Sequence, residues 1–276
     1  MSRQFYLPGD YLRRVKRPAQ EHVFRQLLLE DAAFWLLLAG TGSPPSLRLG
    51  AGALLLFFSF WAIYEAGYRD NDACAQRYEA DPVLTAEAIT FESRNFEAKT
   101  WAAAALLGLA GCWLLQAQIP RWLATLLALR AAYFIFNRID KPARPLPYLM
   151  LQGLRSLALL AVLPVGLAGL LAGLAQAGAR STGYLLYRAR PGAAWPNLPL
   201  RMLQLILFSA LLLAFALAGR PASLGQALLF LAWSGFLARK ELTRPRWLPG
   251  PNPPRENQPR QNQPSQNPRQ RFRSEH

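Results

Sequence analysis

The chain has 276 residues, a formal charge of +15 at pH 7 and 52% hydrophobic residues. Its two cysteines, Cys74 and Cys112, are too few and too far apart for a disulfide framework or a zinc site. The positive charge does not indicate a nucleic-acid partner, because most Lys and Arg residues flank apolar runs, as they do on the cytoplasmic side of membrane spans.

Residues 1–22 are polar and basic and lack the early apolar core of a cleavable signal peptide. We expect them to form a cytoplasmic N-terminal segment, because Arg13, Arg14, Lys16 and Arg17 precede the first apolar run. Apolar runs long enough to span a bilayer follow at 23–41, 47–67, 98–117, 120–137, 201–219 and 222–238. The first contains Glu30 and Asp31, so we expect it to begin as an interfacial helix.

A further apolar region, 147–179, is long for one span and short for two. A single crossing would put Arg180, Arg188 and the basic tail outside, against the positive-inside rule, whereas a hairpin turning near Pro164 keeps them inside. We therefore predict an all-α polytopic membrane helix bundle over residues 23–248. It has about eight transmembrane helices, with seven to nine left open, and both termini on the cytoplasmic side of the inner (plasma) membrane.

The C-terminal residues 249–276 are rich in Pro, Gln, Asn and Arg and nearly devoid of apolar residues. Such a segment cannot bury enough surface to offset the entropy lost on ordering. We predict a disordered basic tail.

Acidic residues gather in the predicted cytoplasmic loop 68–97 and the end of the span before it. Eight of the 16 Asp and Glu residues lie between Glu65 and Glu97. The densest part holds Glu65, Asp70, Asp72, Glu79 and Asp81. A solvated loop with ion pairs is the simplest interpretation, but cytoplasmic loops usually favour Lys and Arg. The clustering therefore also indicates a binding site.

Asp72 and Glu79 are seven residues apart, about two helical turns, and so would point to one face of a helix. Carboxylate oxygens suit Mg²⁺, which typically takes one or two carboxylates together with phosphate oxygens of a substrate. We predict that Asp72 and Glu79 bind Mg²⁺ and act in catalysis, with Asn71 helping to position the site. The metal would then assist the departure of diphosphate from a lipid substrate.

The segment "NDACAQRYE" resembles the first aspartate-rich motif, N-D-x-x-D-x-x-x-D, of the UbiA-type membrane prenyltransferases. Asn71 and Asp72 match its opening, Glu79 stands at the last Asp, and Ala75 replaces the middle Asp. The resemblance implies a site for Mg²⁺ and a prenyl diphosphate or polyprenyl lipid after the second transmembrane helix.

A second segment, "YFIFNRIDKP", is similar to the Tyr-x-x-x-Lys-Arg element that ends the fourth helix of that family. Tyr133 and Arg138 match, and Asn137 replaces the Lys. With Lys141, Arg138 could hold phosphate through paired hydrogen bonds; a purely topological role for these cations is the alternative. The family's second motif, D-x-x-x-D, has no counterpart, because the predicted loop 180–197 contains no carboxylate.

Arg130 and Arg155 fall within predicted spans, where an ionisable group either faces a partner or extends to the interface. We expect both side chains to extend to the cytoplasmic interface.

The leading function is Mg²⁺-dependent prenyl transfer or a related cyclisation. The alternative, favoured by the missing carboxylates, is a non-catalytic membrane subunit or lipid-carrier-binding protein of a larger assembly. A transporter would predict ionisable residues deep in several spans or an internal repeat, and we find neither in the sequence. The sequence does not indicate an oligomeric state.

Overall fold

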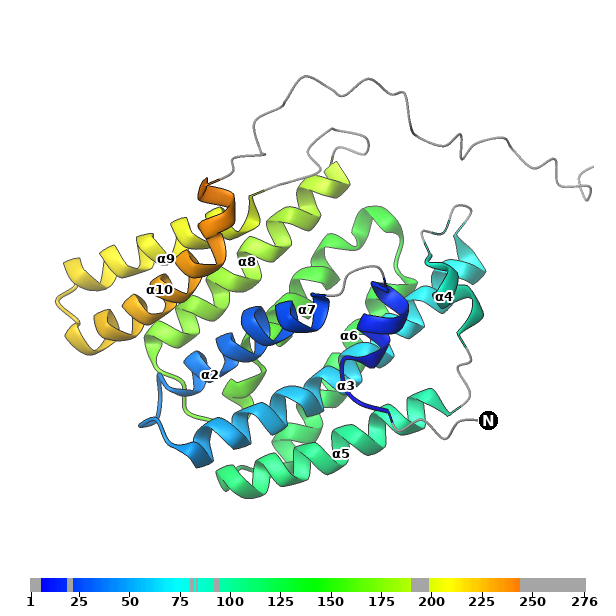
Figure 1. Cartoon of the computed structure of the whole chain (residues 1–276), viewed down its shortest axis with the longest axis horizontal. Helices are drawn as coiled ribbons and strands as arrows, with labels where there is room; N and C mark the ends of the chain where they lie inside the picture. The colour runs from blue at the N-terminus through cyan, green and yellow to red at the C-terminus, as the bar shows by residue number, and fades with distance from the viewer. Residues whose placement is uncertain are drawn as a thin grey trace, which may run out of the picture.

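The computed structural model describes residues 6–18, 22–79, 82, 84–91, 95–189 and 199–243, and every regular element among them is helical (Figure 1). Five of these helices are long and apolar enough to cross a membrane: α3 (Leu47–Tyr78), α5 (Phe96–Leu115), α6 (Ile119–Arg138), α9 (Leu200–Leu217) and α10 (Pro221–Thr243). They coincide with predicted spans. The all-helical class is confirmed, and by the length and composition of these helices the chain is a helical membrane protein.

Local sequence explains where several helices begin and end. The Ser46 hydroxyl accepts a hydrogen bond from the Leu49 amide and so caps the start of α3. Pro120 stands in the first turn of α6, where its missing N–H costs nothing. Between α9 and α10, Gly219 has φ +61°, a left-handed conformation that favours glycine at a helix end.

The predicted hairpin in 147–179 consists of two helices, α7 (Pro145–Leu157) and α8 (Leu167–Ala189), which pack against each other. A short 3₁₀ turn, η4 (Ala158–Ala161), ends α7, and residues 162–166 around Pro164 carry the chain into α8. The break lies where it was predicted, because proline and the residue before it disfavour helix continuation.

The first apolar run is helical throughout but not regular. α1 (Val23–Gln26) leads into a π-helical segment, η2 (Leu27–Ala32), and then α2 (Ala33–Ala39). Asp31 lies in η2 and is only 4% exposed, whereas Phe24, Leu28 and Leu29 of the same run are 37–40% exposed. The run thus buries one face, and its interfacial start stays a prediction.

Successive long helices alternate in direction along the chain, so their termini gather at two ends of the bundle (Figure 1). We call the end where α3, α6 and α8 finish the basic end, because Arg138, Lys141, Arg144 and Arg188 lie there. The opposite end contains Thr41, whose backbone oxygen accepts a hydrogen bond from the side chain of Gln226.

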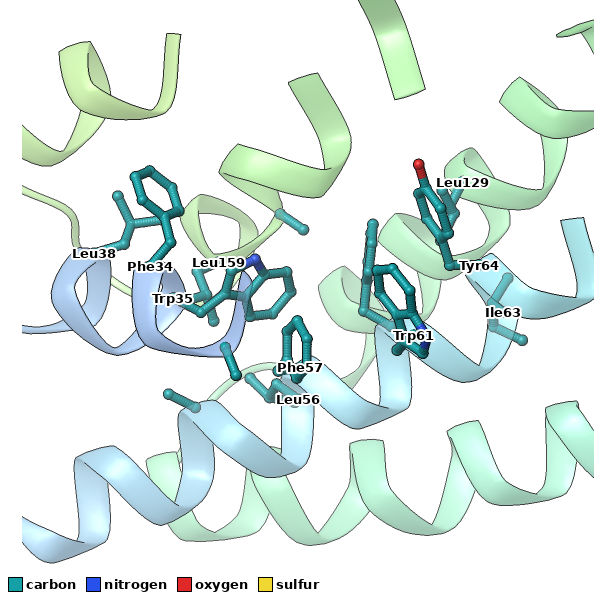
Figure 2. Close-up of a cluster of buried hydrophobic side chains, with 14 of the residues drawn as sticks. Phe34, Trp35, Leu38, Leu56, Phe57, Trp61, Ile63, Tyr64, Leu129 and Leu159 are labelled. Carbon is teal, nitrogen blue, oxygen red and sulfur yellow. The ribbon is translucent and has the colours of Figure 1, made fainter. Parts of the chain in front are cut away.

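α3 is the central helix of the bundle and packs against both α5 and α6. In the most apolar stretch of α3, 61% of the residues are buried inside the structure. In that of α9 only 17% are buried, so most of its side chains lie on the outside of the bundle. The core on α3 is aromatic and is closed by α2 and η4: Figure 2 shows Trp35 and Phe57 beside one another, with Trp61 further along α3. This packing fixes the second half of α3, which carries the acidic residues.

The predicted loop 68–97 starts as helix, because α3 continues past the predicted end of the span to Tyr78. No proline lies between Leu47 and Tyr78 to stop it, and the next one is Pro82. A five-residue helix, α4 (Ala86–Thr90), follows within the same segment. The acidic residues up to Tyr78 therefore have fixed positions on a buried helix. Asp81 and the predicted tail 249–276 lie outside the described residues.

Candidate functional site

A cavity of about 360 Å³ lies at the basic end, where α3, α6, α7 and α8 meet the N-terminal segment, residues 6–18. Its polar lining comprises Lys16, Arg17, Tyr64, Tyr68, Asn71, Glu79, Tyr133, Lys141, Arg144, Tyr148, Gln152, Arg155, Tyr184 and Arg188. Segments that are far apart in the sequence thus share one polar chamber inside a largely apolar bundle.

The charge of this lining is strongly unbalanced. Six cationic side chains face the cavity, and Glu79 is the single carboxylate among the described lining residues. Two further carboxylates, Asp72 and Asp31, contact lining cations from behind the wall. Among the residues that the structure describes, positive charge remains in excess even when both are counted. A cavity with this excess of positive charge is suited to an anion.

Glu79 is the C-cap residue of α3, and the connector after α6 supplies its partners. Its Oε2 lies 3.0 Å from Lys141 Nζ, and its Oε1 lies 3.0 Å from Arg144 Nη1. Burial raises the pKa of the Glu79 carboxyl, but the hydrogen bonds and charges of Lys141 and Arg144 outweigh it, so the pKa is lower than usual. Glu79 therefore stays ionised at neutral pH and holds two cations at the wall.

The lowered pKa predicts how Glu79 contributes to stability as the pH changes. A carboxyl whose pKa is lower in the folded state stabilises the fold above its unfolded pKa, near 4.5, and this contribution is lost as the pH falls below that value. We expect Glu79→Gln to lower the thermal midpoint at pH 7, and the difference from wild type to shrink below about pH 4.5. Thermal unfolding in detergent at several pH values measures this; a difference that grows toward acid would contradict it.

Asp72 is buried and directed to the N-terminal segment. Its Oδ2 accepts a hydrogen bond from the Tyr11 hydroxyl at 3.0 Å, and its Oδ1 pairs with Lys16 Nζ. One heptad earlier, the fully buried Glu65 also contacts this segment, through hydrogen bonds that it accepts from Tyr6 and from two backbone amides. Two acidic residues of α3 are thus anchors for the start of the chain.

A buried ion cluster closes the cavity on the side of α7. Arg155 donates to both carboxylate oxygens of Asp31, at 2.9 and 2.6 Å, and Arg180 of α8 lies 2.8 Å from the same carboxylate. The Arg155 guanidinium also lies over the rings of Trp61 and Tyr64, 5.0 and 5.3 Å from their centroids. Arg155 therefore does not extend to the interface as we expected, because it has a buried partner.

Arg130 reaches carboxylates of two neighbouring helices, one of them the half-exposed Glu97 in the first turn of α5, so its extension to the interface stays a prediction. Its guanidinium lies 3.2 Å from Asp70 of α3 and 3.1 Å from Glu97 of α5. These two pairs connect α6 to both of its neighbours.

Tyrosine rings form the rest of the wall. Tyr64 meets Tyr68 and Tyr133 edge to face, each at 5.1 Å, and Tyr148 stacks on Tyr184 at 4.1 Å between centroids. Tyr133 fits against α3 only because residue 67 is glycine: a Cβ there would lie 2.2 to 2.5 Å from three atoms of the Tyr133 ring. The aromatic wall is thus tightly constrained.

Four of the six predicted site residues come together in the cavity lining: Asn71, Glu79, Tyr133 and Lys141. The other two do not line it. Asp72 contacts Tyr11 and Lys16 of the N-terminal segment. The Arg138 side chain is half exposed, and its guanidinium lies 3.6 Å from the Asp70 carboxylate and over the ring of Phe134.

The two carboxylates predicted to bind Mg²⁺ are each engaged by cationic side chains, Asp72 by Lys16 and Glu79 by Lys141 and Arg144. Among the residues that the structure describes, no group of three or more His, Cys, Asp or Glu side chains is placed to hold a metal ion. A Mg²⁺ site at these two carboxylates would require them to exchange their cationic partners, and it stays a prediction.

Several lining residues were missed by the sequence analysis: Lys16, Arg17, Tyr64, Tyr68, Arg144, Tyr148, Gln152, Arg155, Tyr184 and Arg188. One signal was available, the seven-residue spacing of Glu65, Asp72 and Glu79, which places three acids along one face of α3. The partners of those acids could not be predicted, because they come from segments remote in sequence.

Comparisons with protein-family models, curated proteins and solved structures find no match for this chain. The resemblance to the UbiA-type prenyltransferases stays a prediction.

Proposed function

We propose that this protein binds the phosphate headgroup of a phosphorylated membrane lipid, of the prenyl class, in the cavity at the basic end. The observation that carries this proposal is the excess of cationic side chains around a cavity inside a membrane helix bundle. Arginine and lysine bind phosphate oxygens through charge-assisted hydrogen bonds. The apolar tail would lie among the membrane helices, because apolar surface is more stable in an apolar environment than in water.

The proposal includes a topology of about eight spans. Three further helical units cross together with the five long helices: α1 to α2, α7 with η4, and α8. Both termini and the basic end would face the cytoplasm. The charge distribution supports this orientation: at the opposite end, the described residues include only Arg48, Arg121 and Arg220 as cations, near helix starts. The inner (plasma) membrane is the expected location.

Arg144 provides the sharpest test of binding, with Arg138 as its matched control. Both are arginines of the same connector region, but only Arg144 lines the cavity. We expect Arg144→Gln to weaken the binding of farnesyl diphosphate by about tenfold or more, since a hydrogen bond to a charged group contributes roughly 1.5–3 kcal/mol. Arg138→Gln should change it by less than about twofold.

Equilibrium dialysis of the detergent-purified protein with labelled farnesyl diphosphate measures both variants. A wild type that does not bind, or equal losses in the two variants, would contradict the proposal.

Mg²⁺-dependent prenyl transfer, or cyclisation, is the second candidate. It is favoured by the position of Asn71, Glu79 and Tyr133, since these three residues, singled out by the family resemblance, all line the cavity, as does the predicted phosphate contact Lys141. The two candidates differ in what they predict for Glu79→Gln. For a binding protein, loss of a negative charge from the lining leaves affinity unchanged or raises it. For a Mg²⁺-dependent enzyme, the same change abolishes diphosphate release.

The experiment for this distinction is diphosphate release from a panel of prenyl diphosphates, with and without Mg²⁺. Release by wild type that requires Mg²⁺ and is lost in Asp72→Asn and Glu79→Gln would establish the enzyme. Binding without release, retained in Glu79→Gln, would favour the non-catalytic lipid-binding protein.

A further inference from the structure

Two of the six cavity cations, Lys16 and Arg17, come from the N-terminal segment and not from the helix bundle. They stand at the end of η1 (Leu12–Lys16), a short π-helical turn that lies against α3. The cavity wall is therefore partly made by a segment that could in principle be absent without removing any membrane helix.

Glu65 provides the first anchor of this segment. Its Oε2 accepts hydrogen bonds from the Tyr6 hydroxyl at 2.6 Å and the Gly9 amide at 2.9 Å, and its Oε1 accepts one from the Leu12 amide at 2.7 Å. A fully buried carboxylate requires such donors, because an unpaired buried charge is very costly. Burial and Glu65 both raise the pKa of the Tyr6 hydroxyl, which therefore remains a donor.

Asp72 provides the second anchor, two turns closer to the cavity. It holds the Tyr11 hydroxyl and pairs with Lys16, directly before Arg17. The far side of the segment is fixed by apolar and polar contacts: Tyr11 meets Phe91 edge to face at 5.0 Å, and the Thr85 hydroxyl donates to the Val15 carbonyl at 2.6 Å. The position of Lys16 is thus set from both sides.

We propose that the N-terminal segment is part of the binding site, with Lys16 and Arg17 contacting the ligand's phosphate and Asp72 acting as the positioning residue of Lys16. This inference rests on the proposed lipid-phosphate binding and adds two residues and a segment to it. It also gives the acids of α3 a role: Glu65 and Asp72 hold the cationic wall in place.

The test compares two double variants of the full-length protein with the same loss of charge in the same segment. Lys16→Gln/Arg17→Gln removes the two lining cations. Arg13→Gln/Arg14→Gln removes two cations with half-exposed side chains that pair with Asp10. We expect the first to weaken farnesyl diphosphate binding by about tenfold or more and the second by less than about twofold. Lys16→Arg, which keeps the charge, should bind nearly as well as wild type.

A Lys16→Gln/Arg17→Gln variant that binds within about twofold of wild type, while Arg144→Gln has lost affinity, would overturn the inference and leave the proposed function standing. Absence of binding by wild type would instead overturn the proposed function, and the inference with it.

The positioning role of Asp72 has a readout that needs no ligand. Trypsin cleaves after Lys and Arg, so the rate of cleavage after Arg13, Arg14 and Lys16 reports whether the segment is docked. We expect Asp72→Asn and Tyr11→Phe to accelerate this cleavage and to weaken binding, and farnesyl diphosphate to slow cleavage of wild type. An Asp72→Asn variant with unchanged cleavage and unchanged affinity would overturn the positioning role.

Discussion

Asp31→Asn is expected to destabilise the protein strongly, because it leaves Arg155 and Arg180 without their shared counter-charge inside the bundle. Removing one partner of a buried ion pair typically costs about 3–5 kcal/mol, since the remaining charge stays buried. We expect the thermal midpoint in detergent to fall by roughly 6–12 °C. Ligand binding should weaken as well, because Arg155 lines the cavity.

The neighbouring residue supplies a control for this experiment. Glu30 also pairs with one arginine, Arg201, but both side chains of that pair are nearly one-third exposed. Glu30→Gln should therefore cost less than about 1 kcal/mol. Equal effects of the two changes would contradict a special role for the Asp31 cluster; a small effect of both would show that Arg155 and Arg180 find water or other partners.

Gly67→Ala is expected to have the second large effect. The added Cβ would lie well within contact distance of the Tyr133 ring, so either this ring or helix α3 must move. Overpacking of this kind costs about 1–3 kcal/mol or more. Because Tyr133 lines the cavity and packs against Tyr64, we also expect weaker binding of farnesyl diphosphate.

Gly178→Ala is the matched control, since it makes the same change inside α8 where nothing lies within 4 Å of the added Cβ. It should be neutral or stabilising by up to about 1 kcal/mol, as is usual for Gly to Ala in a helix. Thermal unfolding and dialysis on both variants check the pair. Similar losses in the two would show that the close contact with Tyr133 is not the cause.

The helices could be predicted from the sequence because membrane spans are strongly apolar and their ends carry proline, glycine or charge. The five long helices and the break near Pro164 follow from these signals. The span was predicted to end at residue 67, because polar residues follow, although Asp72 and Glu79 were expected on one helix face. In the structure α3 continues to Tyr78, and Asp70 and Asp72 pair with other segments of the protein.

The site could be predicted only in part. Asn71, Glu79 and Tyr133 were found because they stand in local motifs, and Lys141 because it is a cation just after a predicted span. The partners of the acids could not be found in this way: Lys16 lies 56 residues from Asp72, and Arg144 lies 65 residues from Glu79. The local sequence predicts which residues share one face of a helix, but not which residues from distant segments pack against that face.

The docking of the N-terminal segment also has a consequence for the order in which the protein is made. Residues 6–18 leave the ribosome before Glu65 and Asp72, and Arg188 of the same cavity is synthesised later still. The segment must therefore wait for its partners and is placed after the residues that it contacts. A bulky fusion at the N-terminus would interfere with this late step, whereas membrane insertion of the helices would already be complete.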